Sequence, residues 1–290
     1  MSAFDSAPIF FDQKRFSSDL KSHDPVQVFK NALNAANHHF HNRFNEGDEA
    51  HRLVRERAAF VDLILRYAWK NYDWDISMCL IAVGGYGRGQ LHPYSDIDLL
   101  ILAGKNVAHR YKKSIEQYLA FLWDARLQIS HSVRSVRQCV DAAKKDITIA
   151  TNLMETRLIC GSISNHKKLI QSTGPHQIWS SAEFYAGKLH EQKERHKKHD
   201  DTEYNLEPNV KDAPGGLRDV QLIDWTAKRH FNVTRRSQLV EKGFLLQHEY
   251  LKLYSDEEFL WKVRYGLHLI ADRAEERLLF DHQRTLSKML

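Results

Sequence analysis

The sequence predicts an α+β fold in which a small mixed sheet lies between a helical lead and a C-terminal all-helical domain. Two compact apolar runs, 78–83 and 97–102, are bounded by glycines and have the length of buried strands. The segments before and after this region carry apolar residues at the spacing of amphipathic helices. We therefore place the helical lead at 1–48, the domain with the sheet at 49–150 and the helical domain at 151–290.

The individual elements follow from the same periodicity. Residues 1–25 are polar and are interpreted as a loose arm or a first short helix. A third strand is expected at 127–133, and no strand pattern stands out beyond residue 150. Helical spacing predicts helices at 26–44, 49–72, 111–124, 136–145, 147–159, 182–198, 219–231 and 249–276.

The composition excludes several classes of protein. Hydrophobic residues make up 42% and charged residues 27% of the 290 positions, as in globular domains rather than disordered or fibrous chains. The three cysteines form no CxxC pair, so neither a disulfide framework nor a thiolate zinc site is indicated, and we expect a reducing, cytoplasmic location. No apolar run approaches the ~20 residues of a membrane helix. The N-terminus lacks the pattern of a signal peptide, and no membrane partner is expected.

Charge and histidine content point to no further ligand class. The formal net charge of +5 comes from 42 basic and 37 acidic residues whose signs are interspersed, so nucleic acid is not an expected partner. Histidines cluster at 38–41 and 190–199, and the first cluster lacks acids or cysteines at metal-ligand spacing. We interpret the second cluster, which is almost wholly charged, as a solvated helix face.

The segment that is most informative about chemistry is 83–102. Its first strand ends in Gly84-Gly85, where backbone N–H groups can approach a ligand closely. Asp96 and Asp98 open the next strand, and alternation along a strand places both on one face. Mg²⁺ takes one or two carboxylates and completes its shell with water and phosphate. The pattern therefore predicts a site for a nucleoside triphosphate with bound metal.

Each half of this pattern has a simpler explanation when it stands alone. A lone Asp-x-Asp usually caps a strand, and a lone Gly-Gly is usually a turn; their combination between two apolar strands favours the site. A Walker loop is excluded because no Gly-x4-Gly-Lys-Ser/Thr occurs. A Rossmann fingerprint fits poorly, because Gly85, Gly87 and Gly89 have the wrong third spacing and lead into His-Pro.

The motif from Gly84-Gly85 to Ser95-Asp96-Ile97-Asp98 resembles the signature of the DNA polymerase beta type nucleotidyltransferase superfamily. Further segments are similar to one branch of it, the bifunctional protein-PII uridylyltransferase/uridylyl-removing enzymes. These segments are Leu122–Asp124 leading to His131–Arg134, Asn205–Asp219 and Arg277–Asp281. The resemblance covers roughly residues 50–290 and implies a nucleotidyltransferase domain.

The resemblance also implies a reaction and its site residues. Members of this branch move UMP from UTP onto a tyrosine hydroxyl of the signalling protein PII and release pyrophosphate. Carried over by motif, Asp96 and Asp98 would act in catalysis by holding Mg²⁺. Gly84 and Gly85 would cradle the triphosphate, and Ser95 would donate a hydrogen bond to a phosphate.

Three basic residues belong to the same implied site. Arg88 would counter phosphate charge or brace the loop through a carboxylate. Lys211 and Arg218 flank the turn 214–216, which precedes a helical segment, and a helix N-terminus binds anions. This turn either completes the nucleotide pocket or only docks the helical half onto the sheet domain.

The third predicted strand departs from the superfamily pattern, which often supplies a third carboxylate there. A tyrosine hydroxyl has a pKa of about 10, so its proton needs an acceptor. The strand offers His131, which is either the catalytic base or a buried, hydrogen-bonded histidine. Arg134 would touch phosphate or pair with an acid, and Asp219 or Asp124 would have to enter from outside the strand.

Other functions remain open from the sequence. The missing carboxylate is compatible with a non-catalytic module that binds UTP or PII, and another nucleotidyltransferase with a different acceptor is also possible. Members of the branch continue into a phosphohydrolase domain and glutamine-sensing domains, so we expect a fragment that retains the transfer architecture. The sequence indicates no oligomeric state.

Overall fold

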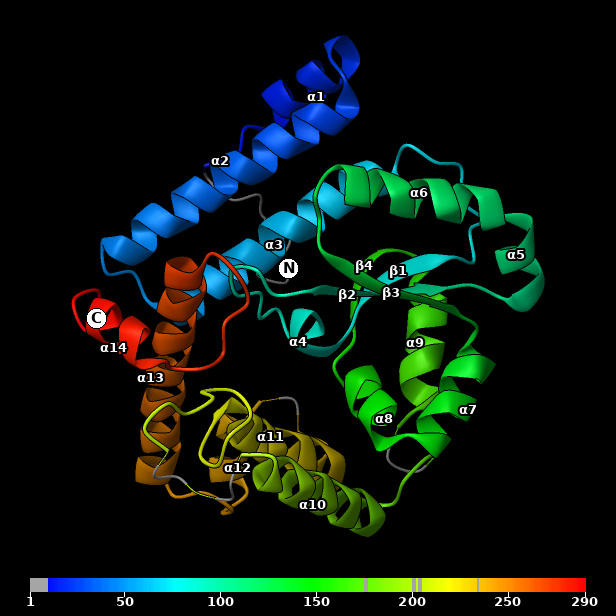
Figure 1. Cartoon of the computed structure of the whole chain (residues 1–290). Coiled ribbons are helices and arrows are strands. Elements are labelled where there is room, and N and C mark those ends of the chain that lie inside the picture. The colour runs from blue at the N-terminus through cyan, green and yellow to red at the C-terminus, as the bar shows by residue number, and fades with distance from the viewer. Residues whose placement is uncertain (1–9, 175–176, 200–201, 203–204, 234) are drawn as a thin grey trace.

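The computed structural model describes residues 10–174, 177–199, 202, 205–233 and 235–290. Its centre is a four-stranded sheet in the order β3-β2-β1-β4 with helices around it (Figure 1). The strands are β1 (Cys79–Ala82), β2 (Ile97–Leu102), β3 (Ile129–Arg134) and β4 (Arg157–Gly161). β1 pairs antiparallel with β2 and with β4, whereas β2 and β3 are parallel. The predicted α+β class with a mixed sheet is confirmed.

The predicted helices agree with observed ones to within about five residues, with one exception described below, and the sequence does not predict the helices at 84–87, 105–110, 163–172, 237–241 and 280–286. The first half contains α1 (Gln13–Ser22), α2 (Pro25–Asn45), α3 (Ala50–Trp69), α4 (Gly84–Gly87), α5 (Lys105–Arg110), α6 (Lys112–Asp124), α7 (Val136–Lys145), α8 (Ile147–Met154) and α9 (Ile163–Ser172). The second half contains α10 (Ser181–Lys197), α11 (Leu217–Phe231), α12 (Ser237–Glu241), α13 (Gln247–Ala271) and α14 (Phe280–Leu286).

The helix predicted at 147–159 is wrong in its second part. The helix ends at Met154, and the following residues form β4, which pairs with β1. The short apolar run within β4 suits a helix or a strand equally, and the exposed edge of β1 decides between them. The sheet therefore extends beyond residue 150, where the sequence placed the end of this domain.

Alternation along the strands divides the core between the two faces of the sheet. Leu99 and Ile101 of β2 belong to a core shared with α3 and α6. Leu100 and Leu102 face the other way, into a core shared with α7, α8 and α9. Asp98 lies two residues before Leu100 and so shares this second face.

The C-terminal helices return to the domain with the sheet. Tyr265 of α13 stacks on Phe44 of α2 with ring centroids 4.5 Å apart. On the same helix, Nδ1 of His268 donates a hydrogen bond to the carbonyl oxygen of Pro93. Helix α13 thus lies against the loop that leads into β2, so the two halves of the chain meet beside that loop.

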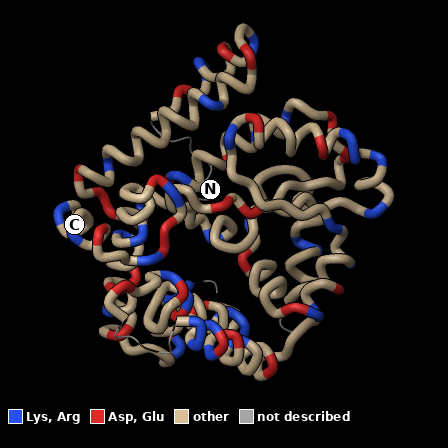
Figure 2. Tube along the Cα trace, in the orientation of Figure 1, with Lys and Arg blue, Asp and Glu red and all other residues tan. Residues whose placement is uncertain are grey.

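Charged residues of both signs are interspersed along the trace (Figure 2). Among the described helices, none combines the length and the apolar character that crossing a bilayer requires.

Candidate functional site

The glycine-rich segment after β1 forms one helical turn, α4. Gly84 has φ +58°, a conformation that favours glycine. A Cβ at Gly84 would lie 3.2 Å from Oδ2 of Asp98 and 3.4 Å from Oδ1 of Asn152. The absence of a side chain therefore lets this turn lie directly against the carboxylate that β2 supplies.

A buried triad of Asp62, Tyr86 and Arg157 anchors the glycine-rich turn. The hydroxyl of Tyr86 donates to Oδ1 of Asp62 at 2.5 Å, and Arg157 pairs with the other oxygen of Asp62. Arg157 also donates to the carbonyl of Tyr86 at 3.0 Å. Asp62 is fully buried in α3, so α3, α4 and β4 are joined at this point.

Gly87, in the same turn, has no room for a side chain. A Cβ there would lie 1.6 Å from the carbonyl oxygen of Glu155, so the backbone would have to move. We expect Gly87→Ala to lower the free energy of unfolding by about 1–3 kcal/mol or more. Gly85→Ala is the matched control, because its Cβ would meet nothing nearer than 3.7 Å. Urea denaturation measures both variants, and equal losses of stability would contradict this packing.

Asp96 and Asp98 open onto a cavity of ≈ 180 Å³ between the sheet domain and the helical half. Asp96 precedes β2 and is exposed, whereas Asp98 is the second residue of β2 and is half-buried. Burial and the Asp96 carboxylate raise the pKa of Asp98, and nearby cations oppose this shift. These cations are Lys211, Arg218 and Arg88. The two neighbouring carboxylates suit a divalent metal, and the cations near them suit phosphate.

Most of the sequence-predicted site residues line this one cavity. They are Gly85, Arg88, Ser95, Asp96, Asp98, Lys211 and Arg218. Gly84 is not part of this lining, but it lies against the Asp98 carboxylate. Lys211 and Leu217, which flank the turn at 214–216, line this cavity together with the carboxylates, whereas residues 214–216 themselves are not part of its lining.

Arg88 and Arg218 of the cavity have few competing partners. Nε of Arg88 donates to Oε1 of Gln90 at 2.9 Å, and Arg88 forms no ion pair in the part of the chain that the structure describes. Nη1 of Arg218 donates to Gln221 at 2.9 Å, and its Nε lies 3.5 Å from Asp212. Of the two interpretations of Arg88, the geometry favours contact with phosphate over a brace through a carboxylate.

Two further residues of the cavity carry no sequence signal. Arg264 of α13 donates to both oxygens of Glu276, at 2.7 and 2.5 Å, and Lys211 lies 3.5 Å from the same carboxylate. Nη2 of Arg264 also donates to the hydroxyl of Ser95 at 3.5 Å. This network connects the loop before β2 with the 205–219 segment and α13.

The Glu276 carboxylate gives the protein a pH-dependent stability. The His268 imidazole, whose Nε2 lies 3.7 Å from the carboxylate, and hydrogen bonds from Arg264 hold the pKa of Glu276 well below 4.5, although burial opposes this shift. A lowered carboxyl pKa stabilises the fold fully above the unfolded pKa, and this stability is lost as the pH falls below it. We expect Glu276→Gln to reduce the difference in free energy of unfolding between pH 7 and pH 4, measured by urea titration. The exposed Glu241, which makes no ion pair among the described residues, is the control; the same loss in Glu241→Gln would contradict this.

The proposed third carboxylates do not enter the cavity. Asp219 accepts hydrogen bonds from Arg195 at 2.7 Å and Gln192 at 2.8 Å, so it braces the start of α11 against α10. Asp124 is exposed at the end of α6 and lines neither the cavity nor its surroundings. Glu276 does line the cavity, but both of its oxygens are bound by Arg264.

His131 lies on the opposite face of the sheet from Asp98. The parallel register pairs Asp98 with Ser130 and Leu99 with His131, so the imidazole shares the face of Leu99. Its ring packs against Trp123 with centroids 5.6 Å apart. This placement disagrees with the predicted role as the catalytic base, because β3 directs the side chain away from the carboxylates.

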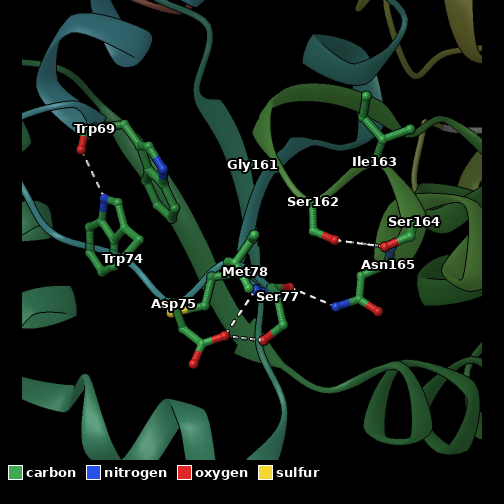
Figure 3. A pocket seen from close by; sticks show the side chains of 11 residues that line it. Trp69, Trp74, Asp75, Ser77, Met78, Gly161, Ser162, Ile163, Ser164 and Asn165 are labelled. Atoms are coloured by element: carbon green, nitrogen blue, oxygen red, sulfur yellow. Dashed lines mark hydrogen bonds between the residues drawn. The ribbon is translucent and has the colours of Figure 1, made fainter.

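A wider cavity of ≈ 950 Å³ lies at the other end of β1 (Figure 3). The stacked rings of Trp69 and Trp74 form one side, and the start of α9 forms the other. Its one acid, Asp75, accepts hydrogen bonds from the backbone and the hydroxyl of Ser77. It contains none of the predicted site residues, so it is not the chemical site.

The side chains of the site can be compared with the ligands that a bound metal ion requires. Within the described ranges, no group of three or more His, Cys, Asp or Glu residues is placed to hold a metal ion. Mg²⁺ needs only one or two carboxylates when phosphates and water complete its shell. Asp96 and Asp98 fit that requirement.

The fold and this site define a nucleotidyltransferase domain. Residues 70–147 match the family described as "Nucleotidyltransferase domain". Residues 183–290, which supply Lys211, Arg218 and Arg264, match the family described as "GlnD PII-uridylyltransferase".

Curated relatives point to one branch of that class. The chain is 49% identical over 285 residues to a bifunctional uridylyltransferase/uridylyl-removing enzyme of Pseudomonas aeruginosa, covering 97% of this chain and 32% of the relative. Enzymes of the same name from Stutzerimonas stutzeri (48%) and Pseudomonas putida (47%) cover 98% of the chain and 32% of their own length. The chain is similar to these enzymes over nearly its whole length, and it spans about a third of the length of these relatives.

Proposed function

We propose that the chain transfers UMP from UTP to a tyrosine hydroxyl of PII and releases pyrophosphate, with Mg²⁺ as the metal. The observation that carries the proposal is the single cavity in which Asp96 and Asp98 meet Lys211 and Arg218. The family described for residues 183–290 supports PII as the acceptor. Cytoplasmic location is part of the same proposal, and all three cysteines are free, as a reducing compartment requires.

The residues of the chain have separate tasks in this reaction. Arg88, Lys211 and Arg218 hold and neutralise the triphosphate, and the turn at Gly84-Gly85 lets it approach the backbone. Asp96 and Asp98 hold the metal, which when bound offsets the charge that develops on the phosphates. Positioning and charge supply most of the catalysis in such transfers, so no covalent enzyme intermediate is required.

The test is transfer of label from radioactive UTP to purified PII in the presence of Mg²⁺. Labelled PII and one pyrophosphate per UMP transferred are expected, with ATP giving less label. Labelling of PII by ATP in preference to UTP would overturn the choice of nucleotide. UTP binding, measured by calorimetry, without any pyrophosphate release would favour a non-catalytic regulatory module. The described lining of the cavity offers no third free carboxylate, which is compatible with such a module.

A further inference from the structure

Asp98 borders a second cavity, of ≈ 160 Å³, on the side of the carboxylate away from the lysine and arginines. Asp98 is the residue that the two cavities share. The second cavity lies between β2, β3, α7 and α8, and its lining is Val83, Asp98, Leu99, Leu100, Ser130, His131, Ser132, Arg134, Cys139, Ile149, Asn152 and Leu153. It therefore adjoins the predicted reaction centre without belonging to the triphosphate pocket.

The register of the sheet places the polar side chains of this cavity. Ser130 pairs with Asp98, and Ser132 and Arg134 follow at two-residue steps, so all of them share one face. Asn152 approaches from α8, with Oδ1 within 3.4 Å of the point that a Cβ on Gly84 would occupy. Neither the serines, Arg134 nor Asn152 makes a side-chain hydrogen bond or ion pair to another described residue.

The lining of the cavity matches one kind of chemical group. Its apolar part comes from Ile149, Leu153 and Leu100, and its polar part comes from the β3 side chains and Asp98. An aromatic alcohol has the same division, since its ring is apolar and its hydroxyl requires a hydrogen-bonding partner. The cavity therefore suits the side chain of a tyrosine.

In-line phosphoryl transfer puts the attacking and the leaving oxygens on opposite sides of the phosphorus. If the basic cavity holds the leaving pyrophosphate, the attacking hydroxyl must enter from across Asp98. We propose that the second cavity is the acceptor subsite, which takes the ring of the acceptor tyrosine and places its oxygen beside Arg134. This inference rests on the proposed function and names residues outside the lining of the basic cavity.

The chemical step balances with the groups present. The phenolic oxygen forms a bond to the α-phosphorus, the bond from that phosphorus to the bridging oxygen breaks, and pyrophosphate leaves with the electron pair. The phenolic proton passes to bulk water. A guanidinium beside the oxygen favours its anionic form, so the reaction needs no histidine base.

The charge of Arg134 already acts inside this cavity. Burial raises the pKa of the Cys139 thiol to about 11, and Arg134 opposes that shift. The charged or titratable residues that border the cavity are Asp98, His131, Arg134 and Cys139, of which His131 has its imidazole on the other face of the sheet. Arg134 is the one permanent cation among them, which is why the acceptor oxygen is assigned to it.

Kinetics with Arg134→Ala test the assignment. We expect kcat/KM for PII to fall about 10²-fold at pH 7, the rise in rate with pH to move to higher pH, and KM for UTP to stay unchanged. Arg134→Lys should recover part of the loss. The matched control is Arg137→Ala, since Arg137 is exposed and pairs only with Asp141 on its own helix. A raised KM for UTP with an unchanged KM for PII would overturn the subsite and make Arg134 a phosphate ligand.

Photocrosslinking separates the subsite from the proposed function. Replacing Ser130 by p-benzoylphenylalanine should crosslink PII at its tyrosine-bearing segment, identified by mass spectrometry. The same probe at Ile76, which is 94% exposed at the far end of β1, should not. A crosslink at that segment without UMP transfer by the unmodified chain would support the subsite and refute the proposed function. Transfer without that crosslink would refute the subsite alone.

Discussion

Replacement of Asp98 by Asn is expected to lower kcat for UMP transfer by at least about 10²–10³-fold. Asp98 is the carboxylate that borders both cavities and lies against the glycine-rich turn. Asparagine keeps the shape of the side chain but removes the negative charge that a divalent metal requires. Transfer of label from UTP to PII, measured at saturating substrates, gives the size of the loss.

The same variant is expected to fold at least as stably as the parent chain. Burial and Asp96 raise the pKa of Asp98, so its charge opposes folding at neutral pH. A thermal unfolding midpoint that is not lowered would therefore separate lost catalysis from lost structure. Asp124→Asn makes the same chemical change at an exposed position and should transfer normally. Full activity of Asp98→Asn would remove the basis of the proposed site.

Asp62→Ala is expected to have the largest effect on stability, about 3–5 kcal/mol in the free energy of unfolding. The fully buried Asp62 carboxylate carries hydrogen bonds from Tyr86 and Arg157. Its removal leaves a mostly buried guanidinium and a buried hydroxyl without this acceptor. Urea denaturation at neutral pH measures the loss.

Two comparisons test whether the buried charge is the cause. Asp141→Ala, which removes an exposed ion pair with Arg137, should change stability by less than about 1 kcal/mol. The double variant Asp62→Leu/Arg157→Met should be more stable than Asp62→Ala, because it removes the buried guanidinium together with the carboxylate that it pairs with. If the double variant is the less stable of the two, the triad acts through packing and not through charge.

Local spacing was enough to predict the carboxylate half of the site. Asp96 and Asp98 follow an apolar strand and a glycine pair by a fixed short distance, and alternation within one strand needs no knowledge of distant partners. Lys211 and Arg218 were assigned only through resemblance, because nothing local shows that a segment far along the chain folds back onto the sheet. In the structure both residues line the cavity that Asp96 and Asp98 border.

The wrong predictions share a cause. β4 depends on the free edge of β1, and its few apolar residues fit either periodicity. His131 was a candidate base because it lies on the neighbouring strand, but the pairing of Asp98 with Ser130 puts it on the other face. Arg264 and Glu276 carry no pattern at all, since their contact arises where α13 ends beside the β2 loop.

The sequence by itself determined the α+β class, the first three strands, most of the long helices and the carboxylate pair beside a glycine turn. These features depend on neighbouring residues and on side-chain periodicity. Only the tertiary structure decided which cations surround the carboxylates, which face each β3 side chain takes, and that Asp98 separates two cavities. Strand register and helix docking bring residues together across long stretches of chain, and the burial that favours one such arrangement is summed over the whole core.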